Sequence, residues 1–246
     1  MKPPHWSLAL TEAPRALIDI TSLQLSKCLL RKAPRGDGHG VMVIPGFMGD
    51  DPFNRPLVKF LNGLGYRAIG WQMGRNLGPR SFSADDLRLK LENLARAGDG
   101  TVSLIGHSLG GIYAREMARL APDSIRQVIS LGSPFGEGND SGSHASRLYK
   151  RLNPDREVDP ELLARREQIA EAPPVPTTSI YTKGDGIVNW RTTVQSKDHE
   201  QTQNIQVIGS HTGLTLNPAV WYLLADRLRH TANTWQHFES AFFNHH

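Results

Sequence analysis

Residues 101–111 read Thr-Val-Ser-Leu-Ile-Gly-His-Ser-Leu-Gly-Gly, and this stretch decides the fold. Its first five residues are mostly apolar or β-branched, which is typical of a buried strand. The segment 112–120 has a helical pattern, so a sharp turn with Ser108 at its bend must join a strand to a helix. Gly106 and Gly110 flank that bend, where larger side chains would collide across the turn. The stretch therefore predicts a strand, a tight elbow that exposes a serine hydroxyl, and a helix.

Short apolar segments recur along the chain and alternate with helical segments. Such alternation favours an α/β fold with a parallel sheet covered by helices on both faces. We expect about six strands in a mostly parallel sheet. Gly65 is expected to end one helix, and Asn217 to cap another. The predicted strands are 41–44, 67–71, 102–105, 127–131, 178–182 and 205–208, and the predicted helices are 57–64, 83–97, 112–120 and one that begins at Pro218.

Two segments depart from this alternation, although we predict one domain over residues 1–246. Residues 14–30 have the imperfect spacing of an amphipathic helix, which could pack on the core or lie against a membrane surface or a partner. Residues 136–176 form a long polar insertion, with a helix expected over 159–170. A long insertion at the strand ends is typical of a lid over a site. The alternative is an insertion on the surface that has no gating role.

The composition is that of an ordinary globular protein, with 39% hydrophobic and 21% charged residues. No stretch approaches the ~18 consecutive apolar residues of a membrane span, and the first residues do not look like a secretory signal. A single cysteine, Cys28, excludes an intramolecular disulfide. We therefore expect a cytoplasmic protein. Its net charge of +4 is scattered and no nucleic-acid motif is present, but weak contact with anionic lipid stays open.

Three chemically active residues follow strands of the predicted sheet. Ser108 follows the third strand, Asp185 follows 178–182, and His211 follows 205–208. Because the carboxyl ends of parallel strands meet at one edge of a sheet, we expect these side chains to converge. His211 would take the serine proton as general base, and Asp185 would orient the imidazole and stabilise its charged form. An acyl-enzyme would then form on the serine and be hydrolysed by water.

Other candidate site residues lie at the same predicted edge. The backbone amides of Phe47 and Leu109 are expected to form an oxyanion hole. Arg75 and Asn76 follow the second strand and could contact substrate, brace the oxyanion loop or cap neighbouring loops. Phe135 could line an acyl pocket, although a packed loop aromatic fits the sequence equally well.

Rivals for the base and the acid also occur in the sequence. His107 precedes the serine, but its side chain should point away from the elbow, and His199 follows a polar, looped stretch. Asp140, Asp155 and Asp159 lie in the insertion. The histidines lack metal-ligand spacing such as His-Glu-x-x-His, so neither a metal nor another cofactor is expected.

The chain resembles the α/β-hydrolase superfamily, most closely its small bacterial lipase and esterase branch. The resemblance implies an α/β-hydrolase fold and a serine hydrolase that acts on carboxylic esters. It gives Ser108, Asp185 and His211 the triad roles, and Phe47 and Leu109 the oxyanion roles. The matching segments are 41–47, 106–111, 130–132, 179–188, 204–207 and 211–214.

The chain also departs from the pattern of this family. The family usually has His-Gly where Pro45-Gly46 stands here, and its secreted lipases carry signals, which we do not expect in this chain. An intracellular carboxylesterase, a phospholipid-directed acyl hydrolase or a thioesterase therefore fits better than a secreted triacylglycerol lipase. An acyltransferase with the same acyl-enzyme and a non-catalytic binding protein on this fold remain alternatives, which covalent labelling by a fluorophosphonate would separate.

Overall fold

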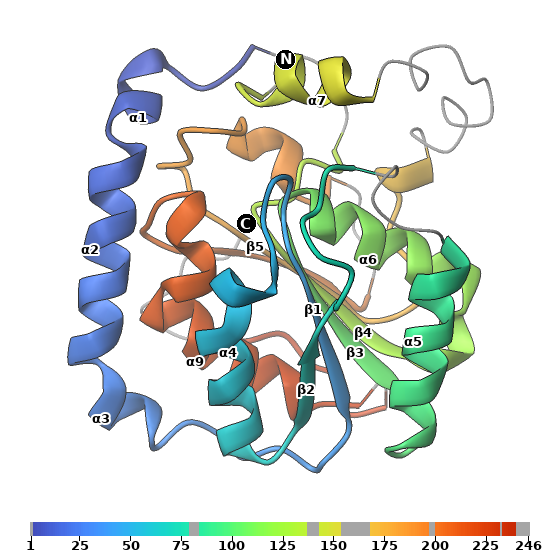
Figure 1. Ribbon diagram of the computed structural model, residues 1–246. Coiled ribbons are helices and arrows are strands. Elements are labelled where there is room, and N and C mark those ends of the chain that lie inside the picture. The colour runs from blue at the N-terminus through green and yellow to red at the C-terminus, as the bar shows by residue number, and fades with distance from the viewer. Residues whose placement is uncertain are drawn as a thin grey trace.

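The computed structural model describes residues 2–78, 84–136, 143–153, 168–196, 200–231 and 233–239. Within these residues six strands form one sheet, in the order β2-β1-β3-β4-β5-β6 (Figure 1). Every neighbouring pair is parallel, which confirms the predicted α/β architecture. The strands are β1 Gly40–Ile44, β2 Arg67–Gly70, β3 Val102–His107, β4 Ile125–Leu131, β5 Thr177–Tyr181 and β6 Thr202–Gln206.

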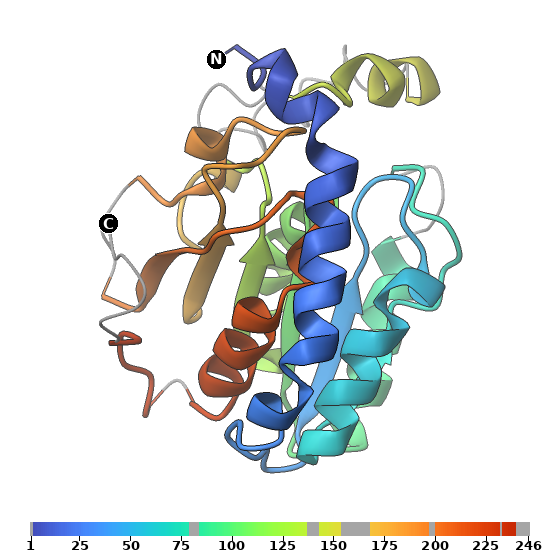
Figure 2. The ribbon, with the colours of Figure 1, turned by 90° about the vertical axis from the view of Figure 1, so that its left-hand side faces the viewer.

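Helices cover both faces of the sheet, as Figures 1 and 2 show. α4, α9 and the N-terminal α2 lie on one side, and α5 and α6 lie on the other. In the part of the chain that the structure describes, no helix is long and apolar enough to cross a membrane. The helices are α1 Trp6–Leu10, α2 Glu12–Leu25, α3 Lys27–Leu30, α4 Asp51–Leu64, α5 Ala84–Arg96, α6 Leu109–Leu120, α7 Ser146–Leu152 and α9 Pro218–Leu228.

The core has two halves because successive strand residues point to opposite faces of the sheet. Val41 and Val43 of β1 pack into the cluster beneath α4 and α9. Met42 and Ile44 of the same strand pack into the cluster beneath α5 and α6. All residues of β1 are buried, which explains why this strand reads as a continuous apolar run.

Several predicted boundaries were wrong. β6 spans Thr202–Gln206 rather than 205–208, because this edge strand alternates buried and half-buried residues and leaves Ile208 exposed. α4 begins at Asp51 rather than 57, since Pro52 is compatible with the first turn of a helix. The predicted end at Gly65 is correct, and this residue has a φ of 105° that favours glycine.

The predicted helix over 14–30 is divided into α2 and α3, which meet at Ser26. Asn217 caps α9 as predicted, with its side chain accepting a hydrogen bond from the amide of Ala219 at 2.9 Å. The first residue of the helix expected over 83–97 lies outside the described residues, as does most of the helix expected over 159–170. The lid over 136–176 therefore stays a prediction.

The register of the sheet aligns the ends of its central strands. Ile44 pairs with Gly106, and Leu131 pairs with both His107 and Ile180. The residues that follow β1, β3, β4 and β5 consequently lie along one edge of the sheet, where the sequence placed the candidate site.

Candidate active site

Ser108 occupies a strained turn between β3 and α6. Its backbone angles are φ 51° and ψ −120°, a conformation that costs a non-glycine residue about 1–3 kcal/mol. A Cβ on Gly106 would lie 2.3 Å from the Cα of Gly111, so the turn can close only over glycine. The amide of Ser108 donates to the carbonyl of Leu131 at 2.8 Å. The fold thus holds this serine in a conformation it would not adopt alone.

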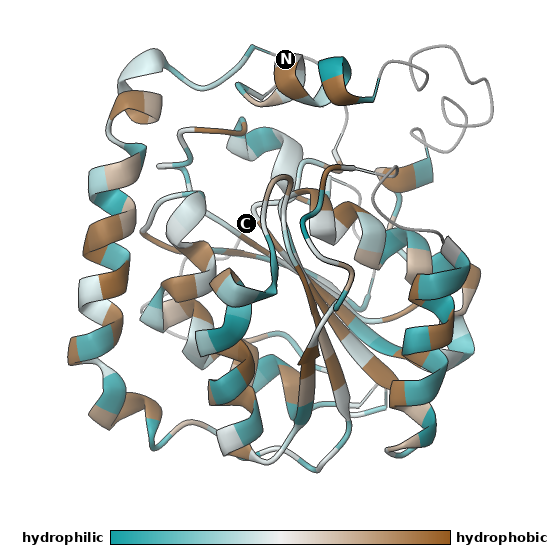
Figure 3. Ribbon diagram, viewed as in Figure 1, coloured by the Kyte–Doolittle hydropathy of each residue, from teal (hydrophilic) through white to brown (hydrophobic). Residues whose placement is uncertain are grey.

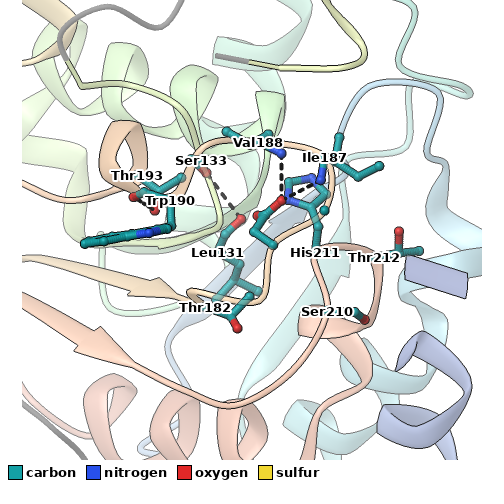
Figure 4. Close-up of polar contacts among 12 residues, drawn as sticks. Leu131, Ser133, Thr182, Ile187, Val188, Trp190, Thr193, Ser210, His211 and Thr212 are labelled. Atoms are coloured by element: carbon teal, nitrogen blue, oxygen red, sulfur yellow. Dashed lines mark hydrogen bonds and ion pairs between the residues drawn. The ribbon is translucent and has the colours of Figure 1, made fainter. Parts of the chain in front are cut away.

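Asp185 and His211 form a buried hydrogen-bonded pair. Asp185 Oδ2 lies 2.6 Å from His211 Nδ1, and the two side chains are 1% and 6% exposed. The second carboxylate oxygen accepts from the amides of Ile187 at 2.8 Å and Val188 at 2.7 Å (Figure 4). These bonds fix the carboxylate, so the Nδ1 edge of the imidazole is occupied and Nε2 is left for other chemistry.

Gly132 links the serine to this pair. It follows Leu131, which accepts from the Ser108 amide, and its φ is 55°. A Cβ at this position would lie 3.2 Å from His211 Nδ1 and 3.4 Å from Asp185 Oδ2. Ser108 and His211 thus approach from two sides of the same turn. In the described part of the chain they do not hydrogen-bond to each other, and such catalytic bonds often tighten only when substrate binds.

The charge around His211 favours its protonated form. Burial by itself lowers the pKa of an imidazole, but the charge and hydrogen bond of Asp185 act in the opposite direction. The charge of Glu12 also acts to raise it, and the pKa of His211 lies above its ordinary value of 6.5. The pair therefore stabilises an imidazolium, which is the state a general base reaches when it takes up a proton.

The sequence suggested that the His107 side chain points away from the elbow, but in the structure it lies against His211. Its ring lies 4.9 Å from the His211 ring, and its Nε2 lies 2.9 Å from the His211 carbonyl oxygen. Burial lowers the pKa of His107 to about 3, and a nearby charge on His211 adds to this. His107 is therefore neutral at ordinary pH and donates from Nε2, which holds the His211 backbone in place.

Two backbone amides are available beside Ser108. Leu109 is the first residue of α6, where an amide has no partner within the helix. Phe47 follows Gly46, and a Cβ on Gly46 would lie 3.1 Å from the Cβ of Ser108. Neither amide donates a hydrogen bond to the protein within the described ranges. The predicted oxyanion donors thus lie on segments that adjoin the serine.

Asn76 braces the loop that carries Phe47. This fully buried side chain donates to the carbonyl of Pro45 at 2.8 Å, and its backbone carbonyl accepts from Met48 at 2.7 Å. Of the roles considered for Asn76, loop bracing is the one its contacts match. Arg75 is exposed. Phe135 is buried beneath the Arg115 guanidinium, whose Cζ lies 3.7 Å from the ring centroid, so it packs as a core aromatic.

The comparisons with known proteins agree with this architecture. A family model described as "alpha/beta hydrolase fold" matches residues 75–153. The solved structure of the pyrethroid hydrolase PytH superimposes with a TM-score of 0.56, at 19% identity, over 79% of this chain and 98% of that one. The chain has the α/β-hydrolase fold.

Curated relatives match only in part. Over 78 residues the chain is 35% identical to the biotin biosynthesis bifunctional protein BioHC of Teredinibacter turnerae, which is 31% of this chain and 14% of that protein. Over 69 residues it is 39% identical to a triacylglycerol lipase of Pseudomonas fragi, which is 28% of this chain and 21% of the lipase. The matches thus span a small part of these relatives' length.

The N-terminal helix α2 also reaches this site of the α/β-hydrolase fold, which the pattern of residues 14–30 did not predict. Glu12, at the start of α2, accepts from the amide of Thr212 at 2.7 Å and from the amide of Gly186 at 3.0 Å. These residues directly follow His211 and Asp185. One buried carboxylate therefore joins the loop of the histidine to the loop of the aspartate.

Two further residues of α2 hold the same loops. Arg15 pairs with Glu12 at 3.0 Å and donates to the carbonyl of Gly184. Asp19 accepts from the amide of Ser210 at 3.0 Å and from its hydroxyl at 2.7 Å. The only sequence signal was two acidic residues seven positions apart, which share one face of a helix.

Part of the insertion contacts the oxyanion loop. The ring of Tyr149 in α7 lies edge-on to the Phe47 ring, with centroids 5.5 Å apart. Asn153 donates to the carbonyl of Leu77 at 3.0 Å. The rivals His199, Asp140, Asp155 and Asp159 lie outside the described residues. Within the described ranges, no group of three or more His, Cys, Asp or Glu residues could hold a metal ion.

Proposed function

We propose that the protein is a serine hydrolase that cleaves carboxylic acyl esters through an acyl-enzyme on Ser108. The observation that carries this proposal is the buried 2.6 Å contact of Asp185 with His211, next to a serine held in a strained elbow. A serine hydroxyl attacks an ester near neutral pH only when an oriented base removes its proton. The α/β-hydrolase fold and the partial match to a lipase support the same activity.

In the first half of the reaction, Ser108 Oγ attacks the ester carbonyl while His211 Nε2 takes the hydroxyl proton. The negative charge that develops on the carbonyl oxygen is stabilised by the amides of Phe47 and Leu109. Two such donors contribute on the order of several kcal/mol to the transition state. The intermediate then collapses, His211 returns the proton to the leaving alkoxide, and the acyl group stays on the serine.

In the second half, water replaces the alcohol. Water attacks the acyl carbonyl while His211 takes one of its protons. His211 then returns that proton to Ser108 Oγ when the carboxylic acid leaves. Asp185 remains ionised throughout and stabilises the imidazolium formed in each half. A thioester would follow the same steps with a thiolate as the leaving group, and an acyltransferase would use an alcohol or amine in place of water.

The test is hydrolysis of p-nitrophenyl esters from acetate to palmitate by the wild type and by Ser108→Ala. The proposal predicts turnover by the wild type and its loss in the variant, with an unchanged unfolding transition. Ser124→Ala is the matched control, because this half-buried serine lies in the short 3₁₀ helix Pro122–Ser124 that follows the far end of α6.

The chain-length profile identifies the acyl group. A peak at short chains indicates an esterase, and a peak at long chains indicates a lipase-like enzyme. Turnover of acyl thioesters alone would identify a thioesterase. Equal activity of wild type and Ser108→Ala would contradict the proposal.

A further inference from the structure

The N-terminal helix α2 buries its acidic residues against the protein and exposes most of its large apolar residues. Its two acidic residues, Glu12 and Asp19, are buried against the protein, at 6% and 5% exposure. Its large apolar side chains Leu17, Ile18 and Leu25 point outward and are 63%, 63% and 82% exposed. The flanking helices α1 and α3 continue this exposed apolar face with Trp6, Leu10 and Leu29. A contiguous exposed apolar surface usually marks a contact with another phase or molecule.

The exposed charges within residues 2–32 all have one sign. Glu12 and Asp19 are the only acidic residues in the sequence from 2 to 32, and both are buried in contacts with the catalytic loops. The exposed charges of the same segment are basic: Lys2, Lys27, Arg31 and Lys32. Apolar side chains flanked by exposed lysine and arginine are the composition of helices that lie on anionic lipid surfaces.

The position of α2 suits a flat, deformable surface. Figure 2 shows α2 as the outermost helix on its side of the molecule, in front of α9 and α4. Figure 3 shows apolar residues recurring along the length of α1 and α2. The face is therefore a projecting ridge, and a ridge can sink into lipid headgroups without a complementary groove.

We propose that the outer face of α1, α2 and α3 docks the protein onto an anionic membrane surface. The common positive charge disfavours a second copy of the chain on this face, because the basic residues of the two copies would be brought together. The ridge ends beside the candidate site, since Glu12 at the start of α2 accepts from the amides of Gly186 and Thr212, which follow Asp185 and His211. Docking thus brings a lipid surface next to the edge of the sheet that carries Ser108.

The single cysteine allows a direct test, because Cys28 is exposed on α3 within this segment. The protein is labelled at Cys28 with an environment-sensitive fluorophore and mixed with vesicles of equal parts phosphatidylcholine and phosphatidylglycerol. The expected result is a blue shift and quenching by headgroup-labelled nitroxide lipid. A Cys28→Ser/Leu120→Cys protein carries the label on α6, across the sheet, and should show neither change.

Co-sedimentation with the same vesicles tests the face itself. Leu17→Gln/Ile18→Gln/Leu25→Gln should bind about tenfold or more weakly than the wild type. The matched control is Leu89→Gln/Leu120→Gln/Ile208→Gln, three exposed apolar residues elsewhere, which should bind as the wild type does. Arg31→Gln/Lys32→Gln should weaken binding to anionic vesicles, whereas Lys90→Gln/Arg96→Gln on α5 should have little effect.

Three outcomes overturn the proposal. The wild type does not bind anionic vesicles, or the two triple variants bind equally, or ultracentrifugation shows a dimer that the α2 variant converts to a monomer. The last outcome would assign the face to a second copy. None of these measurements depends on turnover, so failure of the hydrolase proposal would be seen separately.

Discussion

The carboxylate of Glu12 accepts a hydrogen bond from the amide of Thr212 at 2.7 Å, directly after His211 in the chain. Its other oxygen accepts from the amide of Gly186 at 3.0 Å, directly after Asp185. A helix at the start of the chain therefore sets the distance between two loops that β5 and β6 deliver separately. We infer that Glu12 is a positioning residue for the Asp185–His211 pair.

Replacing Glu12 by Gln should lower kcat more than it changes KM. The amide keeps one acceptor oxygen but presents an NH2 group to the second backbone donor, so one of the two loops is released. An increase of about 1.4 kcal/mol in the activation free energy corresponds to about a tenfold lower rate. Steady-state kinetics on the best p-nitrophenyl ester measures both constants.

The same variant should change the pH profile. The Glu12 charge acts to raise the pKa of His211, and the base must be neutral to accept a proton. Removing that charge lowers the pKa, so the acidic limb of kcat/KM should move to lower pH. The charge of Asp185 and the neutral state of His107 are the same in the wild type and the variant. Glu92→Gln, at an exposed ion pair on α5, should leave rate and profile unchanged, and equal effects of both variants would exclude a positioning role.

Asp185→Asn should abolish most activity without unfolding the protein. Asparagine can still accept from the amides of Ile187 and Val188, but its NH2 group would donate to His211 Nδ1. That places the imidazole proton on Nε2, where it blocks general-base catalysis. We expect kcat to fall on the order of 10³–10⁴-fold. The control is Asp123→Asn at an exposed position, and near-normal turnover by Asp185→Asn would remove Asp185 from the mechanism.

Gly132→Ala should damage both the site and the fold. The φ of 55° is strained for alanine, and the new Cβ would lie 2.9 Å from Leu214 Cδ1 and 3.2 Å from His211 Nδ1. Stability should fall by about 1–3 kcal/mol. The kcat of the folded variant should also fall, because the new Cβ contacts the His211 ring as well as weakening the fold. Gly63→Ala is the matched control, because its Cβ meets nothing within 4 Å, and equal turnover of the two variants would contradict this contact.

Asn76→Ala should weaken the oxyanion loop. The variant loses the bond to the Pro45 carbonyl and the 3.1 Å bond from the amide of Gly78, and stability should fall by about 1–3 kcal/mol. If the loop shifts Phe47, kcat should fall by about 10²-fold with a smaller change in KM. Asn93→Ala, on an exposed part of α5, is the control. A loss of stability with unchanged kcat would limit Asn76 to a structural role.

The sheet was predictable because its signals are local. Apolar runs, a glycine-flanked elbow at Ser108 and the caps at Gly65 and Asn217 each act within a few residues. The positions of Asp185 and His211 followed from the rule that parallel strands end at one edge. The structure brings these two side chains to 2.6 Å, although they are 26 residues apart in sequence.

The role of α2 was not predictable by the same reasoning. Amphipathic spacing predicts that apolar residues face the core, but of the large apolar residues of α2 only Leu23 is buried. The helix packs instead through Glu12 and Asp19, whose partners lie about 170 to 200 residues further along the chain. The bonds that hold it become visible only when the loops after β5 and β6 are in place. His107 was misjudged for the same reason, since its partner is the backbone of His211.

The most direct test of the account is covalent labelling by a fluorophosphonate, followed by peptide mapping of the adduct. The account predicts one adduct on Ser108 in the wild type, no adduct in Ser108→Ala, and slowed labelling in Asp185→Asn. An adduct on another residue, or equal labelling of wild type and Ser108→Ala, would contradict the assignment of Ser108 as the nucleophile.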